Sequence, residues 1–284
     1  MSVMPPSVSE VARLARELGF HFDEKDNVEF RDLMLGSLAA YSALDTLPDE
    51  LPVPKYKRTP GYVPTGDQNP LEAWARKVEI EGAKSGPLKG KSFAAKDCIC
   101  VAGVPLMNGS ATLEGYMPEV DATVVTRMLD AGAVLHGKAA NEDFCYSGGS
   151  HTNARAPVHN PYRRGYGAGG SSSGSAALVG NGDVDMALGT DQGGSVRQPA
   201  AACGLVGMKA TFGLVPCTGV LGMEYSLDHV GPLTKSVADN ALMLEVIAGP
   251  DGFDSRQMDV KVDSYRADLK RGLKLSLIHI SEPT

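Results

Sequence analysis

A stretch of small residues between Gly169 and Pro199 constrains this chain more than any other part of it. The stretch reads GGSSSGSAALVGNGDVDMALGTDQGGSVRQP and holds two serine-bearing glycine turns, in which Ser171 and Ser195 are 24 residues apart. Glycine lets the backbone approach a ligand closely, and successive N–H groups in such a turn can bind an anion. A hydroxyl beside those N–H groups supplies a nucleophile and a place for an oxyanion. One such turn alone is more typical of an ordinary tight turn, but two together indicate a site.

The residues around this stretch alternate between strand and helix patterns. Within it we expect a helix over 173–179, a turn over 180–182 and a strand through Val184, Met186 and Leu188. Such alternation favours an α/β layered fold with a largely parallel or mixed sheet.

The flanking segments continue the same alternation. We expect strands over 91–99 and 133–137 and a helix over 121–130 that is capped by Asp121, with Gly132 at its end. A further helix is expected to open at 236–239 and end at Gly249.

The first part of the chain has a different pattern. Residues 7–18 and 28–47 have helical periodicity, and the second segment opens with a capping-box-like Asp26-Asn27-Val28-Glu29. Six prolines over 48–70 predict an extended connector. We therefore expect a small helical unit with its linker over residues 1–69 and an α/β core over 70–274.

The last ten residues do not continue this pattern. They read LSLIHISEPT and resemble the translated read-through of a sequencing adapter more than a C-terminal strand. We therefore expect a non-native tail over 275–284 and a natural protein that continues beyond Lys274.

Charge and hydropathy narrow the possible partners. The 284 residues are 43% hydrophobic, which allows a substantial core, and their net charge is −7, with no basic stripe. Nucleic acid and anionic membranes are therefore not expected partners. No apolar run approaches the roughly 18 residues that span a bilayer, and MSVMPPSVSE lacks the order of a signal peptide. A cytoplasmic protein is the expectation.

The cysteines and histidines do not have metal-binding spacing. The five cysteines are an odd number, and Cys98-Ile-Cys100 is neither a redox C-x-x-C nor half of a zinc site. Buried free thiols are the expected state. The six histidines are scattered without an H-E-x-x-H pattern, so we expect no metal and no cofactor.

Taken as a whole, residues 169–199 resemble the signature of the amidase signature family of serine hydrolases. The resemblance includes the ending Asp-x-Gly-Gly-Ser-x-Arg-x-Pro, and it extends over about residues 70–250 through KDCICVAGVPLMNGS and DATVVTRMLDAGAVLHGKAANEDF. The N-terminal helices and GNGDVDMALGTDQGG are most similar to the bacterial amidases associated with nitrile hydratase. The family implies an α/β fold with a mixed sheet flanked by helices, here with a small helical N-terminal unit and without the family's C-terminal half.

The resemblance also implies a Ser-Ser-Lys relay. Ser195 matches the acylated nucleophile, Ser171 the bridging serine after a cis peptide bond, and Lys96 the base at the end of the relay. The remaining matches are the oxyanion-hole N–H groups of Gln192, Gly193, Gly194 and Ser195, and a supporting pair, Asp191 and Arg197.

A lysine can act as a base only when it is neutral, which requires its pKa to fall from about 10.4 to about 7–8. Lys96 ends the apolar run Phe93-Ala94-Ala95, which could bury its amine. A lone lysine in a strand is otherwise more typical of a solvated edge.

The implied activity is hydrolysis of small aliphatic or aromatic primary amides to carboxylic acid and ammonia through an acyl-enzyme. Two alternatives stay open: the glutaminase subunit of a tRNA-dependent amidotransferase, and an inactive truncated remnant. The N-terminal helices favour the amidase, and the resemblance implies a homodimer through them. Tyr146 is a candidate substrate-pocket residue, although a packed surface tyrosine fits equally well.

Two positions depart from the family pattern. Ser173 stands where glycine is commonest, and Ala210 replaces a usual proline. We expect both changes to lie away from the relay.

Overall fold

The computed structural model describes residues 3–47 and 51–269, so the expected tail over 275–284 lies outside the described part. The chain forms two compact units that divide between Leu51 and Pro52, and not at the expected boundary after residue 69. Residues 52–69 are part of the larger unit. There Arg58 forms an ion pair with Asp121.

The smaller unit is a pair of helices, α1 (Val8–Glu17) and α2 (Glu24–Leu44). Both begin with a capping box, which for α2 is formed by Asp23 and Asp26. The helix therefore begins four residues before the expected Val28. The sequence pattern suggested Asp26 as the start of the box, whereas Asp26 is the third helical residue and bonds back to the backbone N–H of Asp23.

The larger unit contains a six-stranded mixed sheet in the order β1-β3-β2-β6-β8-β7. β2 runs parallel to its neighbours β3 and β6, and the other pairings are antiparallel. The six strands are β1 (Trp74–Glu81), β2 (Ser92–Lys96), β3 (Val134–Ala139), β6 (Met186–Asp191), β7 (Val206–Gly207) and β8 (His229–Thr234). A separate hairpin pairs β4 (His159–Asn160) with β5 (Arg163–Gly167).

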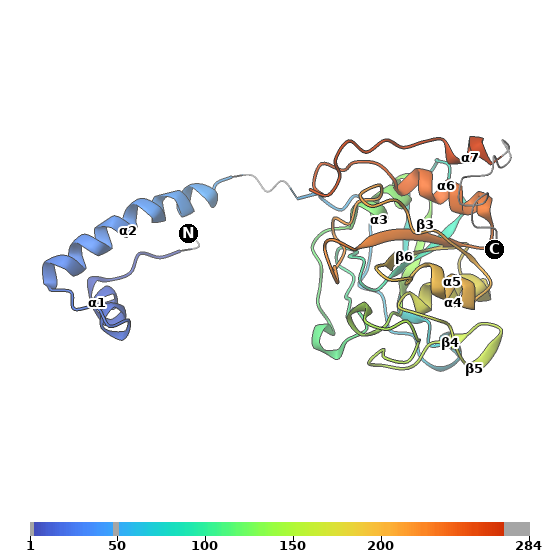
Figure 1. Cartoon of the computed structure of the whole chain (residues 1–284), viewed down its shortest axis with the longest axis horizontal. Coiled ribbons are helices and arrows are strands. Elements are labelled where there is room, and N and C mark those ends of the chain that lie inside the picture. The colour runs from blue at the N-terminus through green and yellow to red at the C-terminus, as the bar shows by residue number, and fades with distance from the viewer. Residues whose placement is uncertain (1–2, 48–50, 270–284) are drawn as a thin grey trace, which may run out of the picture. The chain divides into compact units, whose positions relative to one another are not determined.

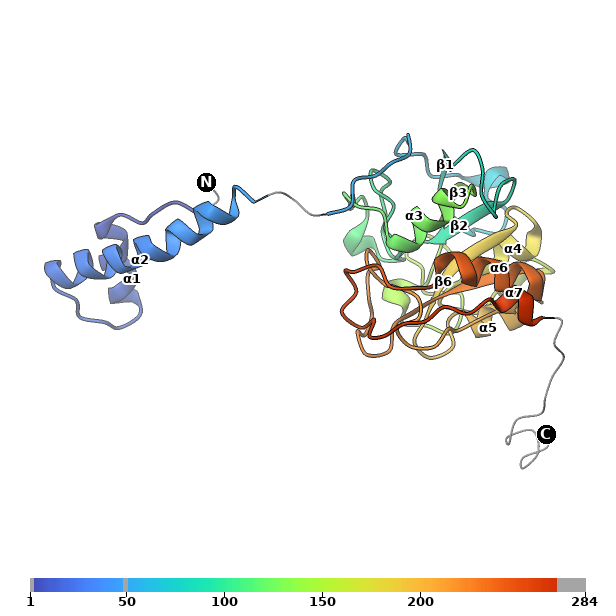
Figure 2. The ribbon, with the colours of Figure 1, turned by 90° about the horizontal axis from the view of Figure 1, so that it is seen from above.

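Helices cover both faces of this sheet (Figures 1 and 2). The helices of this unit are α3 (Thr123–Asp130), α4 (Ser173–Asn181), α5 (Arg197–Ala202), α6 (Val237–Ile247) and α7 (Tyr265–Asp268). Phe93 and Ala95 of β2 share one hydrophobic cluster with the buried residues of α3 and α6. Ala94, between them, packs in a second cluster with the alanines of α4. The expected α/β architecture, a mixed sheet flanked by helices, is confirmed.

One predicted cap is wrong. α3 begins at Thr123 with Ala122 as its N-cap and has no side-chain cap. The carboxylate of Asp121 instead accepts hydrogen bonds from the backbone N–H of Ala102 and from Arg58. A long-range ion pair therefore replaced the local cap that the sequence suggested. By contrast, α6 opens where the sequence predicted, and Ser236 is its N-cap.

In the part of the chain that the structure describes, none of the helices combines the length and the apolar character needed to cross a bilayer.

Candidate active site

The alternation of strand β2 aims Lys96 at α4. Lys96 has the same strand parity as Ala94, which packs against α4, and its side chain is fully buried. Its Nζ lies 2.8 Å from Ser171 Oγ and 2.7 Å from Thr190 Oγ1. The structure thus brings two of the three expected relay residues into direct contact.

Ser171 lies in a bend directly before α4. The Gly170–Ser171 peptide bond is cis, as the resemblance implies. The N–H of Gly170 donates to the carbonyl of Gly148 at 2.9 Å. A Cβ at position 170 would lie only 2.0 Å from the carbonyl oxygen of Gly149. Only glycine fits at this position, and the close backbone packing presents the Ser171 hydroxyl to Lys96.

The second glycine turn connects β6 to α5 and is organised by Asp191. This carboxylate is fully buried and accepts hydrogen bonds from the N–H groups of Gly194 (2.7 Å) and Val196 (3.0 Å). Arg197 completes the cradle with an ion pair at 2.9 Å. Burial alone would raise the pKa of Asp191, but the Arg197 hydrogen bond and the two N–H groups outweigh it and lower the pKa to about 2. Asp191 is thus a stable anion that holds the shape of the turn.

Ser195 lies in this turn and is half-buried. The two turns meet through the backbone, because the N–H of Ser172 donates to the carbonyl of Ser195 at 3.3 Å. Within the described residues, the hydroxyls of Ser171 and Ser195 do not form a direct hydrogen bond. The structure therefore places the turn that holds Ser195 beside Ser171, but it does not join the two hydroxyls that the expected relay would link.

The expected oxyanion hole is partly free. In the described part of the chain, the N–H groups of Gln192, Gly193 and Ser195 have no protein acceptor. The N–H of Gly194 differs from the expectation because it donates to Asp191. Gly194 adopts a φ of 128°, a conformation that L side chains rarely adopt, and so needs to be glycine.

Sequence reasoning missed Thr190, the second partner of Lys96. Its signal was its place in the quoted run GTDQGG, directly before Asp191. Two buried thiols also lie against Thr190 Oγ1, Cys98 at 3.7 Å and Cys145 at 4.0 Å. The hydrogen bond from Cys98 lowers the pKa of Cys145, Lys96 acts in the same direction, and burial opposes both. Lys96 thus lies in a closely packed polar cluster.

All five cysteines are free thiols as expected, although Cys217 is only half-buried. Across residues 3–47 and 51–269, no three His, Cys, Asp or Glu side chains are grouped so that they could hold a metal ion.

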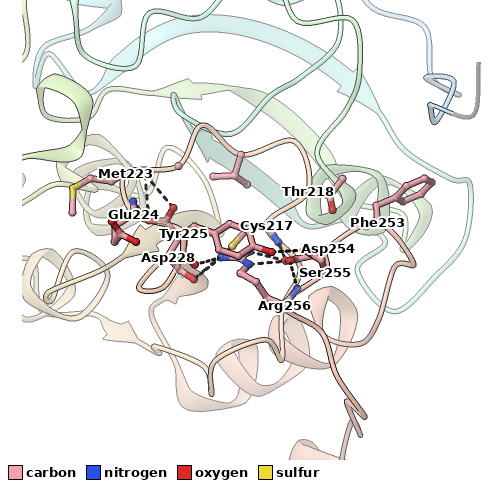
Figure 3. Close-up of a pocket in the computed structure, with 12 residues that line it drawn as sticks. Cys217, Thr218, Met223, Glu224, Tyr225, Asp228, Phe253, Asp254, Ser255 and Arg256 are labelled. Atoms are coloured by element: carbon pink, nitrogen blue, oxygen red, sulfur yellow. Dashed lines mark hydrogen bonds and ion pairs between the residues drawn. The ribbon is translucent and has the colours of Figure 1, made fainter. Parts of the chain in front are cut away.

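A cavity of about 490 Å³ is lined by twelve residues between Cys217 and Arg256, none of which lies in the turn that holds Ser195 (Figure 3). Asp228 lines it and accepts a hydrogen bond from Gln192 Nε2 at 2.6 Å. Figure 3 shows Tyr225 and Arg256 together in this cavity, where Arg256 pairs with Asp254. The expected pocket residue Tyr146 does not line this cavity, and 75% of its surface is exposed.

Comparison with known proteins places this arrangement in a family. Residues 67–280 match the family described as Amidase. The chain is 44% identical over 285 residues to the enantioselective amidase of Rhodococcus rhodochrous, a match that covers 99% of this chain and 54% of that protein. It is also 44% identical over 219 residues to a glutamyl-tRNA(Gln) amidotransferase subunit from Methanosarcina acetivorans, a match that covers 76% of this chain and 45% of that protein.

Solved structures agree with these matches. The corresponding glutamyl-tRNA(Gln) amidotransferase subunit from Thermotoga maritima is similar with a TM-score of 0.65 at 40% identity, over 69% of this chain and 44% of that one. Native peptide amidase from Stenotrophomonas maltophilia is similar with a TM-score of 0.61 at 36% identity, over 65% of this chain and 39% of that one. The chain spans about half the length of the curated relatives it matches. Because the family match covers well over half of the residues and the fold agrees with it, this chain belongs to the amidase family.

Proposed function

We propose that this chain carries the catalytic relay of an amidase that hydrolyses small aliphatic or aromatic primary amides. The observation that carries the proposal is the contact of 2.8 Å between the buried Lys96 Nζ and Ser171 Oγ, beside the turn that holds Ser195. A buried amine next to a hydroxyl is the arrangement that general-base activation of a nucleophile needs.

In the proposed reaction, neutral Lys96 accepts a proton from Ser171 while Ser171 takes the proton of Ser195. The Ser195 oxygen then attacks the amide carbonyl carbon. The free N–H groups of Gln192 and Gly193 stabilise the resulting oxyanion. Ser171 returns the proton to the leaving nitrogen, ammonia departs, and water hydrolyses the acyl-enzyme by the same relay in reverse.

We place the acyl group of the substrate in the cavity next to Asp228. Its volume of about 490 Å³ is within the range of small-molecule sites, and Gln192 links its wall to the nucleophile turn. Tyr146 does not line this cavity, and it remains a proposed substrate contact through its exposed ring.

A glutaminase component of a tRNA-dependent amidotransferase is the second candidate. The support for it is the 44% identity to a subunit of such an enzyme over 219 residues. The match to the Rhodococcus amidase covers 99% of this chain, whereas the match to the amidotransferase subunit covers 76%. The amidase match therefore includes the N-terminal helices, which favours the first candidate. Glutaminase activity that appears only with added partner proteins would favour the second.

The N-terminal helices are proposed to form a homodimer. The support is an apolar groove of about 270 Å³ on this unit, lined by side chains that include Leu14, Leu18, Phe20 and Phe30. All four are more than 40% exposed, and a second copy of the same helices would cover them.

The test uses a fluorophosphonate probe and ammonia release from propionamide and benzamide. We expect the probe to label Ser195 in the parent chain, and Ser195→Ala to abolish both labelling and turnover. Lys96→Met should slow labelling by about 10²–10⁴-fold. Ser226→Ala, in an exposed loop, is the matched control and should behave like the parent. A parent chain that stays unlabelled would favour the inactive remnant.

A further inference from the structure

A buried carboxylate lies against the Ser171 bend. Glu142 is fully buried. Its Oε2 accepts hydrogen bonds from the N–H groups of His151 (2.9 Å) and Thr152 (2.7 Å) and from the Thr152 hydroxyl (2.8 Å). Its Oε1 accepts from Ser173 Oγ at 3.0 Å. All four donors are uncharged, and burying a carboxylate is costly unless such bonds satisfy it.

These bonds hold the bend from both sides. Ser173 is the first residue of α4, two positions after Ser171. The backbone N–H of Glu142 donates to the carbonyl of Ser171 at 3.2 Å. A Cβ added to Gly170 would lie 2.9 Å from Glu142 Cγ. The side chain and the backbone of Glu142 thus touch the residues before, at and after the position of Ser171.

Ser173, which stands where the family pattern has glycine, therefore has a hydrogen-bond partner in Glu142. Glycine at this position would offer no hydroxyl to Glu142 Oε1. Contrary to the expectation that this position lies away from the relay, Ser173 connects α4 to the carboxylate that contacts the bend.

We propose that Glu142 is a positioning residue that orders the 170–173 bend and thereby holds Ser171 Oγ within hydrogen-bond distance of Lys96. The inference rests on the proposed function. Lys96 Nζ and Ser171 Oγ are 2.8 Å apart, and a misplacement of about 1 Å in a catalytic group can cost about 10²-fold in rate. Glu142 does not exchange protons with the substrate in this proposal.

Two variants separate the hydrogen bonds from the charge. Glu142→Ala removes all four acceptor contacts. Glu142→Gln can keep the three bonds at Oε2 through its carbonyl oxygen and donate its amide to Ser173, whose hydroxyl then accepts. Asp121→Ala is the matched control, because it removes another buried carboxylate that bonds to a backbone N–H and to Arg58.

Two measurements are made below the unfolding temperature of each variant. The first is the rate of Ser195 labelling by a fluorophosphonate. The second is hydrogen exchange of the Gly170 and Gly174 amides, which bond to Gly148 and Ala140. For Glu142→Ala we expect labelling to slow by about 10²-fold and exchange at these amides to accelerate at least about tenfold. Glu142→Gln should recover most of the labelling rate and most of the exchange protection. Asp121→Ala should leave the labelling rate and the exchange at these amides unchanged.

Several results would overturn the proposal. One is unchanged exchange over 170–174 in Glu142→Ala, and another is unchanged labelling despite faster exchange. A Glu142→Gln variant that is as impaired as Glu142→Ala would also contradict it. If Glu142→Ala does not fold, Ser173→Ala decides, because it removes one bond and should slow labelling by about threefold with faster exchange at Gly174. If the parent is not labelled at all, the proposed function fails, while the exchange data still decide whether Glu142 orders the bend.

Discussion

At the scale of single residues, the candidate site depends on how the Lys96 amine bonds to two hydroxyls, those of Ser171 and Thr190. The amine donates a hydrogen bond to one hydroxyl and accepts one from the other. A neutral amine has two donor hydrogens and one lone pair. If Thr190 Oγ1 accepts one hydrogen at 2.7 Å, the lone pair is free to face Ser171 Oγ at 2.8 Å. Thr190 thus orients the amine.

The first prediction concerns Thr190. Thr190→Val keeps the shape of the side chain but removes the acceptor, which leaves a buried donor of Lys96 without its partner at a cost of about 1–3 kcal/mol. We expect Ser195 labelling to slow by roughly tenfold or more. Thr190→Ser retains the hydroxyl and should stay near the parental rate. Equal rates for the valine and serine variants would argue against this role.

The second prediction concerns acid stability. The pKa of Asp191 is about 2 in the folded chain and about 3.9 when unfolded. A lowered pKa contributes stability that is present above the unfolded value and is lost as the pH falls from about 4 towards 2. Urea unfolding across this range should show a loss of about 1 kcal/mol from Asp191, because Arg197 is half exposed and solvent weakens the pair.

Arg197→Met tests the cause of this pH dependence. The variant should unfold more easily at pH 7 and lose less stability between pH 4 and pH 2 than the parent. Lys84→Met, at an exposed position, is the control and should follow the parental curve. An unchanged pH dependence in Arg197→Met would exclude the ion pair as the cause.

At the scale of elements, the site depends on how closely α4 packs on the sheet. The helix is made almost entirely of small residues, and seven of its residues from Ser173 to Val179 are buried. A Cβ at Gly174 would lie 2.4 Å from the carbonyl oxygen of Ala73 and 2.6 Å from the backbone nitrogen of Ala140. This close approach brings the N-terminal end of α4, with Ser171 before it, to the end of β2.

The third prediction compares two glycines inside helices. Gly174→Ala should destabilise the larger unit by about 1–3 kcal/mol, because the new methyl group meets backbone atoms that cannot move aside. Gly36→Ala in α2 has no atom within 4 Å of the added Cβ and should stabilise the helical unit by about 0.5–1 kcal/mol. Thermal unfolding of both variants measures this contrast. Stabilisation by both changes would show that helix propensity, and not packing, decides at Gly174.

At the scale of the whole molecule, the two compact units bury very different amounts of apolar surface. The larger unit has two extensive hydrophobic clusters, whereas only Val11 and Ala15 are buried among the described hydrophobic residues of the helical unit. Large apolar side chains on these helices are exposed, for example Leu33 at 74%. An exposed apolar surface of this kind is typical of a protein–protein contact site.

The fourth prediction follows from this exposure. If the helices form a homodimer through the groove, Leu18→Asp, at a groove-lining side chain that is 74% exposed, should convert dimers to monomers in light scattering coupled to size exclusion, with the circular dichroism of the chain unchanged. Val53→Asp, at a side chain that is 83% exposed in the larger unit, is the control and should leave the mass unchanged. A parent chain that is monomeric at micromolar concentration would refute the dimer.

The chain's local elements followed from the sequence because their signals are local. Apolar periodicity and Ser236 predicted α6, and the small-residue run after Ser172 predicted α4, since caps and periodicity act within a few residues. Asp121 failed as a cap because a distant guanidinium, Arg58, competes for its carboxylate.

The sequence by itself determined which residues are candidates for the relay, because Lys96, Ser171 and Ser195 match the amidase signature through their order along the chain. Only the tertiary structure decided what surrounds the relay. Thr190 and Glu142 acquire their partners through the packing of β2, β6 and α4. The physical reason is that a buried polar atom bonds to whatever the fold brings within about 3 Å, and that distance is independent of separation in sequence.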